Sequence, residues 1–327
     1  MYTSRSKYNY LQSLSNDGVI SAIAIDQRGS LKKMISAASG KEPDQKEIED
    51  FKKVISTELT PYASAILTDP QYGLPAAKDR AKNAGLLLAY EKTGYDTTEP
   101  GRMCDLLSHW SAKRIKEAGA DAVKFMLYYD VDEPKEINDK KQAFVERIGD
   151  ECKAEGISFF LELMSYDANI ADNKSKEYAK VKPHKVNDMI REFAKRRYNV
   201  DVLKVEVPVN MAYVEGFGDD PVYTQDEAEK YFRDQNLATD GLPFIFLSAG
   251  VSAQMFQDTL KFAHKAGSTF NGVLCGRATW RHGVEPYATE GENAERKWMD
   301  NEGRKNIEEL NDVLQHTATS WKEKVEI

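Results

Sequence analysis

Charged residues interrupt three short apolar segments of this 327-residue chain. Lys124 lies within AVKFML, Glu162 within FFLELM, and Lys204 within VLKVEV, which also contains Glu206. Ionised side chains are costly to bury unless they are paired or take part in chemistry. The two lysines and the carboxylate between them in sequence are therefore a candidate reaction centre, if the fold brings their segments together.

A buried lysine can form a Schiff base with a ketone, and the resulting iminium accepts the electron pair of a breaking carbon–carbon bond. Burial and a neighbouring cation both lower the pKa of a lysine, which frees its lone pair for attack. We assign the nucleophile to Lys204, the neighbouring cation to Lys124 and proton transfer to Glu162. Asp26, which follows the first apolar run, could orient the carbinolamine or share the proton transfers. The alternative is that the charged residues form only a buried network of ion pairs.

Two later segments have the composition of a phosphate site. SAGVS at 248–252 precedes a predicted helix whose N-terminal N–H groups would favour an anion, which makes Ser248 and Gly250 candidate ligands. In CGR, Gly276 permits close approach of the backbone and Arg277 can donate two parallel hydrogen bonds. Each segment is a weak signal alone, but together at neighbouring strand ends they predict phosphate binding.

The sequence offers no pattern for a metal. Its five histidines form neither HxH nor HExxH, whereas a metal-dependent reaction would need a cluster of histidines and carboxylates. Cys104, Cys152 and Cys275 are far apart and lack CxxC spacing, so we expect them to pack in the core. We expect no metal and no cofactor.

These residues must be positioned by a regular alternation of short apolar runs and longer amphipathic segments. The runs are about six residues long and many are rich in Val, Ile, Leu and Phe, as in buried parallel strands. We predict strands at 19–25, 62–68, 85–90, 121–127, 157–163, 201–207, 243–248 and 271–276.

Apolar residues between the strands recur at helical spacing, which predicts helices packed on the sheet. We expect 293–321 to form the last outer helix, and 130–139, 166–183 and 215–224 to be loops or short extra helices. The apolar stripes are Ile48, Phe51, Ile55 and Leu59; Met103, Leu106, Leu107 and Trp110; Phe144, Val145, Ile148 and Cys152; and Val186, Met189, Ile190 and Phe193.

Eight strands alternating with helices imply right-handed βαβ units, and a closed (β/α)8 TIM barrel is the economical arrangement. An open doubly wound sheet is the alternative, but the first turn lacks the GxGxxG of a dinucleotide site. Because side chains alternate along a strand, Lys204 and Glu206 are expected on the face that points into the barrel. No linker-like segment occurs, so residues 1–327 are expected to form a single domain.

Composition excludes several classes of protein. An apolar fraction of 41% and a charged fraction of 30% suit a soluble globular chain and argue against disorder. No apolar run approaches the roughly 20 residues that cross a bilayer, and the N-terminus lacks a signal segment, so we expect a cytoplasmic protein. A net charge of −8 without a basic stripe argues against nucleic acid as a partner.

Several long segments, in this order, resemble the bacterial tagatose 1,6-bisphosphate aldolases of class I, the Schiff-base type. These enzymes belong to the tagatose 6-phosphate route of lactose and galactose use. The resemblance runs from residue 11 to the C-terminal helix and is carried by AIDQRGSLKKM, TDPQYGLPA, DAVKFMLYY, FFLELMSY, DVLKVEVPVN, LSAGVS and GVLCGRATW.

The resemblance implies reversible cleavage of D-tagatose 1,6-bisphosphate to dihydroxyacetone phosphate and D-glyceraldehyde 3-phosphate. It implies that Lys204 carries the Schiff base and that Glu162 is the acid/base, with Asp26, Gln27 and Lys124 at the substrate. It also implies lax stereospecificity, so that fructose 1,6-bisphosphate and epimers are substrates, and a homodimer. The residues that it places on a phosphate are Ser248, Gly250, Gly276 and Arg277.

Two other functions stay open at this point. A sulfofructose-phosphate aldolase of the same family would keep Lys204 and Glu162 but change the residues at the far end of the substrate. A regulatory protein that senses the sugar phosphate and binds a protein partner could use the same pocket. A partner whose association depends on sugar phosphate would favour the second function.

Overall fold

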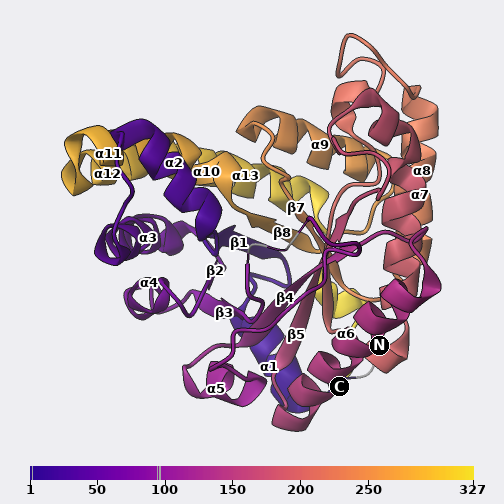
Figure 1. Cartoon of the computed structure of the whole chain (residues 1–327), viewed down its shortest axis with the longest axis horizontal. Helices are drawn as coiled ribbons and strands as arrows, with labels where there is room; N and C mark the ends of the chain where they lie inside the picture. Colours follow the sequence, from indigo (N-terminus) through magenta and orange to yellow (C-terminus); the bar gives the residue numbers. More distant parts are fainter. Residues whose placement is uncertain (2, 94, 96) are drawn as a thin grey trace.

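The computed structural model describes residues 1, 3–93, 95 and 97–327. Its eight parallel strands form a closed barrel in sequence order, with β8 pairing to β1, so the predicted (β/α)8 fold is confirmed (Figure 1). Every predicted run contains a strand, and β4 and β5 extend two residues beyond the prediction. The strands are β1 (Ile20–Ala24), β2 (Ala65–Thr68), β3 (Gly85–Ala89), β4 (Ala122–Tyr129), β5 (Ser158–Ser165), β6 (Val202–Val205), β7 (Phe244–Leu247) and β8 (Gly272–Cys275).

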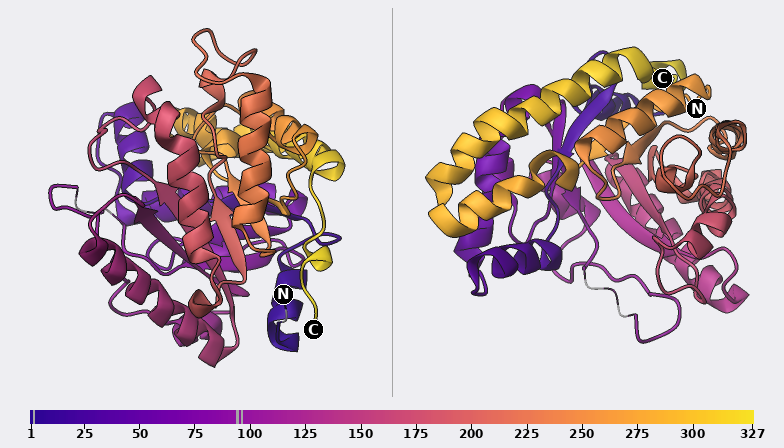
Figure 2. Two further views of the ribbon diagram at one scale, coloured as in Figure 1. Left: turned by 90° about the vertical axis from the view of Figure 1, so that its right-hand side faces the viewer. Right: turned by 90° about the horizontal axis from the view of Figure 1, so that it is seen from above.

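Helices surround the barrel, as Figures 1 and 2 show from three directions. Three of the four predicted apolar stripes lie on α3, α6 and α7, where most of their residues are buried. The helices are α1 (Arg5–Ser13), α2 (Gly29–Ser39), α3 (Gln45–Leu59), α4 (Leu74–Lys78), α5 (Ala112–Glu117), α6 (Lys135–Glu155), α7 (Lys176–Phe193), α8 (Gln225–Ala238), α9 (Ala253–Lys265), α10 (Arg277–Trp280), α11 (Val284–Glu290), α12 (Glu292–Trp298) and α13 (Arg304–Thr317).

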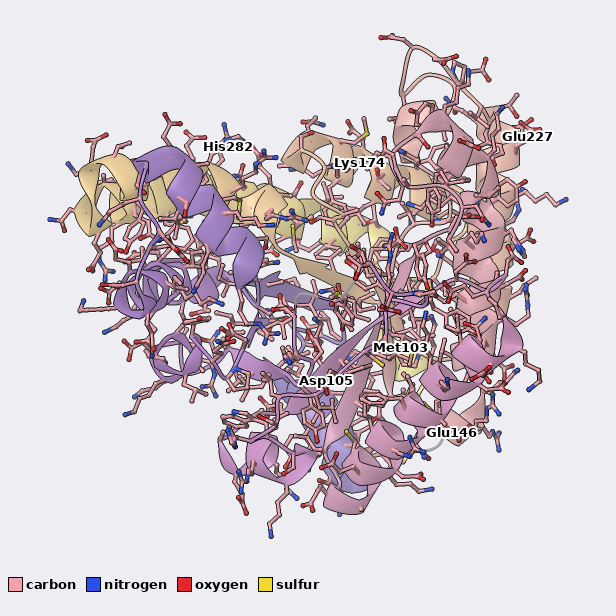
Figure 3. All side chains as sticks on the ribbon, viewed as in Figure 1. Met103, Asp105, Glu146, Lys174, Glu227 and His282 are labelled. Atoms are coloured by element: carbon pink, nitrogen blue, oxygen red, sulfur yellow. The ribbon has the colours of Figure 1, made fainter. Side chains whose placement is uncertain are left out.

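The fourth stripe, Met103 to Trp110, is not a helix, so that prediction was wrong. The N–H of Leu107 donates to the carbonyl of Tyr90, and the N–H of Lys92 donates to the carbonyl of Asp105. Backbone hydrogen bonds therefore cross to the residues after β3 instead of running along a helix. Met103 and Asp105 lie on this loop (Figure 3), and Met103 is 40% exposed.

Three other predicted boundaries also change. The 21-residue helix α6 begins at Lys135, within the stretch 130–139 that was expected to be a loop or short extra helix. The last helix, expected at 293–321, is α12 and α13 joined by a π-helical turn at Met299–Gly303. Pro183, expected to end a loop or short extra helix at 166–183, lies inside the 18-residue helix α7, which begins one residue after its N-cap Ser175. The Ser175 side chain accepts a hydrogen bond from the N–H of Tyr178 and so satisfies one of the free donors at the start of the helix.

Side chains alternate between the barrel interior and the helix layer. In β6, Leu203 and Val205 pack in the outer core against the helices, whereas Val202 belongs to the inner core. Lys204, two positions after Val202, faces the interior nearer to the C-terminal mouth. The same step of two residues leads from Phe160 to Glu162 in β5 and from Ala122 to Lys124 in β4.

The two ends of the chain seal the N-terminal end of the barrel. Leu11 and Leu14 from α1 and Trp321 and Val325 from the C-terminal tail are buried with the inner core. The N–H of residue 326 donates to the carbonyl of residue 1, and the termini lie side by side (Figure 2). The charged interior residues therefore face the opposite, C-terminal end. No helix in the described part of the chain has the length and apolar character needed to cross a bilayer.

Candidate active site

A pocket of about 700 Å³ opens at the C-terminal ends of the strands. Lys124 lies just beneath its wall, with 1% of the residue exposed, and contacts carboxylates that line the pocket. The structure therefore brings the residues to which the sequence analysis gave a catalytic or binding role to one place. Those that line the pocket are Asp26, Gln27, Glu162, Lys204, Ser248, Gly250, Gly276 and Arg277.

Glu162 joins the two lysines. Glu162 and Lys204 are partners in the β5–β6 ladder, and Lys204 Nζ lies 2.9 Å from Glu162 Oε1. The other oxygen, Oε2, lies 2.7 Å from Lys124 Nζ. Burial by itself would raise the pKa of Glu162, but the charges of Lys124 and Lys204 outweigh burial and hold this pKa below its usual value. The two lysines therefore favour the ionised form of Glu162.

Lys124 is held by three carboxylates. Its Nζ lies 2.8 Å from Asp26 Oδ2 and 2.6 Å from Glu91 Oε1, in addition to its contact with Glu162. Burial by itself would lower the pKa of Lys124, but Asp26, Glu162 and Glu91 raise it well above the ordinary value. Lys124 is thus held as a cation between three carboxylates.

Asp26 faces the same lysines from the end of β1. Burial acts to raise its pKa, while the charges of Lys124 and Lys204 lower it more strongly, so that the pKa lies well below its usual range. Its neighbour Gln27 also lines the pocket, and the buried Gln27 Oε1 has no hydrogen-bond donor among the described residues. This amide oxygen is available to a polar group in the pocket.

The loop after β7 approaches Arg277 closely. Ala249 and Gly250 adopt left-handed backbone conformations, with φ of 49° and 74°. A side chain at Gly250 would place its Cβ 3.3 Å from Arg277 Nη2, so glycine permits this approach. Ser252 is the N-cap of α9, which confirms the predicted helix after SAGVS. Ser248, Gly250 and Arg277 together form a small polar wall suited to an anion.

Glu206 is not part of this centre, contrary to the expectation that it shares a face with Lys204. The strand ends at Val205, and the Glu206 carboxylate accepts hydrogen bonds from the N–H and hydroxyl groups of Ser165. Its other oxygen lies 3.6 Å from Lys182 Nζ on α7. Alternation predicts direction only while the strand continues, which is why this prediction was wrong.

The family model described as DeoC/LacD family aldolase matches residues 20–282. The chain belongs to this family. It is therefore an aldolase, as the resemblance implied.

Curated relatives match this aldolase over nearly its whole length. It is 64% identical over 314 residues to tagatose 1,6-diphosphate aldolase 2 of Enterococcus faecalis, covering 96% of this chain and 94% of the relative. It is 60% identical over 326 residues to tagatose 1,6-diphosphate aldolase 1 of Streptococcus mutans, covering 99% and 100%.

Solved structures share the fold at low sequence identity. A fructose-bisphosphate aldolase from Plasmodium falciparum superposes with a TM-score of 0.68 at 14% identity, covering 98% of each chain. A Schiff-base-forming fructose-1,6-bisphosphate aldolase gives a TM-score of 0.58 at 14% identity, covering 94% of this chain and 100% of the other.

Sequence reasoning missed several residues that line the aldolase pocket. Glu91 directly follows the GLLLAY run, so the rule that selected Asp26 after the first run would also have selected it. Arg28, Lys33 and Arg102 add positive charge to the wall of the pocket. Arg28 lies in the AIDQRG segment, but Lys33 and Arg102 lie on a helix and a loop without a distinguishing pattern.

Arg102 is supported by aromatic rings. Its guanidinium lies 4.3 Å from the ring centroid of Tyr166 and 5.5 Å from that of Tyr128. Tyr128 belongs to β4, and Tyr166 directly follows β5. Stacking on their faces can hold a guanidinium in place without neutralising it. Arg102 is thus a cation fixed at a different part of the pocket wall from the loop after β7.

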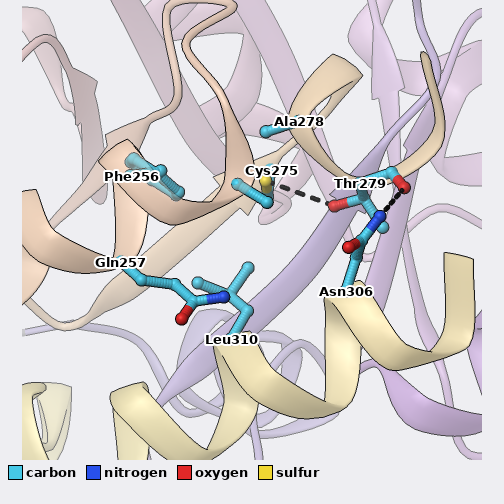
Figure 4. Close-up of a pocket in the computed structure, with 8 residues that line it drawn as sticks. Phe256, Gln257, Cys275, Ala278, Thr279, Asn306 and Leu310 are labelled. Atoms are coloured by element: carbon cyan, nitrogen blue, oxygen red, sulfur yellow. Dashed lines mark hydrogen bonds between the residues drawn. The ribbon is translucent and has the colours of Figure 1, made fainter. Parts of the chain in front are cut away.

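A small cavity of about 10 Å³ lies between β8, α9, α10 and α13 (Figure 4). The Thr279 hydroxyl donates to Cys275 Sγ at 3.3 Å, and Asn306 Nδ2 donates to the Thr279 carbonyl at 3.0 Å. Burial raises the pKa of the Cys275 thiol. All three cysteines are buried and unpaired, as predicted for core residues.

The described residues contain no group of three or more His, Cys, Asp or Glu side chains arranged to hold a metal ion. The point between Asp26, Glu91 and Glu162 is filled by the ammonium group of Lys124. That the reaction needs no metal stays a prediction.

Proposed function

We propose that this aldolase reversibly cleaves D-tagatose 1,6-bisphosphate to dihydroxyacetone phosphate and D-glyceraldehyde 3-phosphate through a Schiff base on Lys204. One observation carries the mechanism: Lys204 Nζ, at the pocket wall, lies 2.9 Å from a carboxylate that also contacts a second lysine. The names of relatives at 60% and 64% identity support the choice of sugar.

The first stage forms the iminium. Lys204 gives a proton to Glu162 and attacks the C2 ketone as a neutral amine. As the C–N bond forms, the nitrogen loses a further proton and the ketone oxygen gains one, which yields a neutral carbinolamine. Loss of the Lys204 charge removes one of the two cations that lower the pKa of Glu162, so Glu162 holds its proton at this stage. That proton then goes to the departing hydroxyl, water leaves, and the iminium cation stays on Lys204.

The second stage breaks the C3–C4 bond. A carboxylate removes the proton of the C4 hydroxyl, the bonding pair moves into the iminium to give an enamine, and C4 leaves as the aldehyde of D-glyceraldehyde 3-phosphate. Glu162 is ionised again after the dehydration, and Asp26 is an ionised carboxylate at the same wall. Protonation at C3 and hydrolysis of the iminium release dihydroxyacetone phosphate and restore Lys204.

The distribution of cations suits a substrate with two phosphates. We assign one phosphate to Ser248, Gly250, Gly276 and Arg277, with Gln27 beside them; a side chain at Gly276 would place its Cβ 3.2 Å from Gln27 Nε2. Arg28, Lys33 and Arg102 supply further positive charge for the other phosphate. A sulfonate head group carries less negative charge than a phosphate. Arg28, Lys33 and Arg102 are therefore the residues that would distinguish a sulfonate from a phosphate.

Several finer expectations belong to the same proposal. The enzyme acts in the tagatose 6-phosphate route of lactose use, accepts fructose 1,6-bisphosphate and epimers, and works as a cytoplasmic homodimer. Residues 1–327 act as one domain, in keeping with a barrel whose closed end is sealed by both chain termini. A protein partner that responds to sugar phosphate would add a regulatory role to catalysis.

The substrate proposal is tested by coupled assays of triose phosphate release. Tagatose 1,6-bisphosphate, fructose 1,6-bisphosphate and 6-deoxy-6-sulfofructose 1-phosphate are compared by kcat/KM on one enzyme preparation. We expect efficient cleavage of both bisphosphates and poor cleavage of the sulfonate. A preference for the sulfonate would replace the proposal with the sulfofructose-phosphate alternative.

A further inference from the structure

Glu91 lies deeper in the centre than the two carboxylates assigned to proton transfer. Its side chain is fully buried, with 0% exposed, compared with 12% for Asp26 and 9% for Glu162. Oε1 accepts a hydrogen bond from Lys124 Nζ at 2.6 Å, and Oε2 accepts one from the N–H of Met126 at 3.2 Å. The carboxylate is thus fixed by one side chain and one backbone group of β4.

Glu91 is the third carboxylate in contact with the ammonium group of Lys124. A lysine has three N–H donors, and three carboxylate oxygens lie within 2.8 Å of Lys124 Nζ. Lys124 donates hydrogen bonds to Asp26 and Glu91 and forms an ion pair with Glu162, so three carboxylates share its charge. Its role is to hold carboxylates, and two of these, Asp26 and Glu162, are the groups that the proposed reaction protonates and deprotonates.

A lysine with only those two partners would lose part of its support during the reaction. When Glu162 takes a proton it becomes neutral, and a buried ammonium needs a compensating charge. Glu91 supplies a charge that does not change in the proposed steps. Its main-chain carbonyl also accepts a hydrogen bond from Arg28 Nη2 at 2.8 Å, so the same residue anchors a cation at the pocket wall.

We propose that Glu91 is a positioning residue of the aldolase centre, which keeps Lys124 charged and in place while Asp26 and Glu162 exchange protons with the substrate. The inference rests on the proposed function. The ionisable groups that face Glu91 are Lys124 from β4, Arg28 and Asp26 from the end of β1, Glu162 from β5 and Tyr95 from the following loop. Of these, Lys124 makes the closest contact.

The test replaces Glu91 by glutamine, which keeps the shape and an acceptor oxygen but removes the charge. For Glu91→Gln we expect kcat for bisphosphate cleavage to fall about 10- to 100-fold, with KM changed much less. The acid limb of the pH profile should move to lower pH, because Lys124 then acts more strongly on Asp26 and Glu162. A kcat and pH profile equal to those of the wild type would overturn the proposal.

Asp201→Asn is the matched control. Asp201 is a buried carboxylate that accepts one hydrogen bond from a lysine, Lys7, at 2.7 Å and one from the backbone N–H of Phe159 at 2.8 Å, at the closed end of the barrel. It should lower thermal stability while leaving kcat and the pH profile unchanged. If Asp201→Asn and Glu91→Gln lower kcat equally, with neither shifting the profile, Glu91 has only a structural role and the proposal fails.

A double-variant cycle tests whether Glu91 acts through Lys124. Glu91→Gln combined with Lys124→Met should be no slower than Lys124→Met alone, whereas multiplied losses would contradict the inference. If Glu91→Gln does not fold, Glu91→Asp, which keeps the charge but withdraws it from Lys124, should give the same loss of kcat. Borohydride trapping of the wild type on Lys204 separates the two proposals: absence of an adduct there rejects the Schiff-base function, whatever the Glu91 variants do.

Discussion

Glu162 and Lys204 face each other across the β5–β6 ladder, with Oε1 and Nζ 2.9 Å apart. They belong to segments separated by more than forty positions, yet strand pairing makes them one unit. At this distance a proton can pass directly between the amine and the carboxylate, without a bridging group. This arrangement is the one that the first proton transfer of the proposed Schiff-base mechanism requires.

Replacing Lys204 should abolish cleavage. Lys204→Arg keeps a cation beside Glu162 but has no amine that can be deprotonated, and Lys204→Ala removes the group. Both variants should fold, because Lys204 lies at the pocket wall rather than in the apolar core. Turnover, circular dichroism and peptide mapping after borohydride reduction with dihydroxyacetone phosphate check this. Appreciable residual turnover in either folded variant would contradict the assignment of the Schiff base to Lys204.

Glu162→Gln should lower kcat by about 10²- to 10⁴-fold, because the amide keeps the shape but transfers no proton. Since the pKa of Glu162 is lowered in the folded protein, the carboxylate stays ionised at pH values where an exposed glutamate is already protonated. Wild-type activity should therefore persist below the usual glutamate pKa of about 4.3, as far as the fold survives. A stopped-flow pH series measures this; an acid limb well above that value would speak against Glu162 as the base.

Arg277→Ala should act mainly on substrate binding. A charge-assisted hydrogen bond to phosphate contributes about 1.5–3 kcal/mol, which corresponds to a rise in KM of about 10- to 100-fold. Arg281→Ala is the control, since Arg281 lies one turn further on and outside the pocket lining. Steady-state kinetics and inhibition by inorganic phosphate check the result. Equal effects of the two substitutions would show that Arg277 contributes only to the net positive charge near the pocket and does not bind the phosphate directly.

Chelators should not inhibit the enzyme. The electron sink in the proposed reaction is the iminium on Lys204, so no step requires a Lewis acid. Activity is measured after prolonged dialysis against EDTA, with and without added zinc. Loss of activity that zinc restores would replace the Schiff-base mechanism by a metal-dependent one.

Glu295 on α12 makes a separate prediction about stability. It is buried, and neither carboxylate oxygen has a hydrogen-bond partner among the described residues. Burial, together with nearby Glu292 and Asp50, raises its pKa well above the usual value despite the charge of Arg296. Because the pKa of Glu295 is raised in the folded protein, its contribution to the free energy of unfolding is most favourable below its unfolded pKa of about 4.3. This contribution is lost as the pH rises above that value.

Glu295→Gln should therefore stabilise the protein by about 1–3 kcal/mol at pH 7 and by much less at pH 4. Thermal or urea unfolding at the two pH values measures the difference. Glu290→Gln, an exposed carboxylate at the end of α11, should have little effect at either pH. A benefit of Glu295→Gln that does not grow with pH would contradict a buried, proton-binding Glu295.

The sequence by itself determined the barrel and most of the charged residues of its pocket. Side chains alternate along a strand with a period of two residues, which is a local pattern. The apolar runs therefore predicted the strands, and Lys124, Glu162 and Lys204 were selected as the charged residues within them. The glycine-containing segments after β7 and β8 predicted the polar wall formed by Ser248, Gly250 and Arg277, because a glycine-containing segment before a helix is itself a local sequence pattern. These features depend on a few neighbouring residues, and the structure places them together in one pocket.

Only the tertiary structure decided how these charges are shared. Pairing of β3 with β4 brought Glu91, which follows β3, to Lys124, whereas the end of β6 at Val205 turned Glu206 away towards Ser165. The apolar stripe that begins at Met103 became a loop, because its backbone groups found partners after β3. Hydrogen bonds and ion pairs between distant segments depend on their positions in space, and no local pattern of residues encodes those positions.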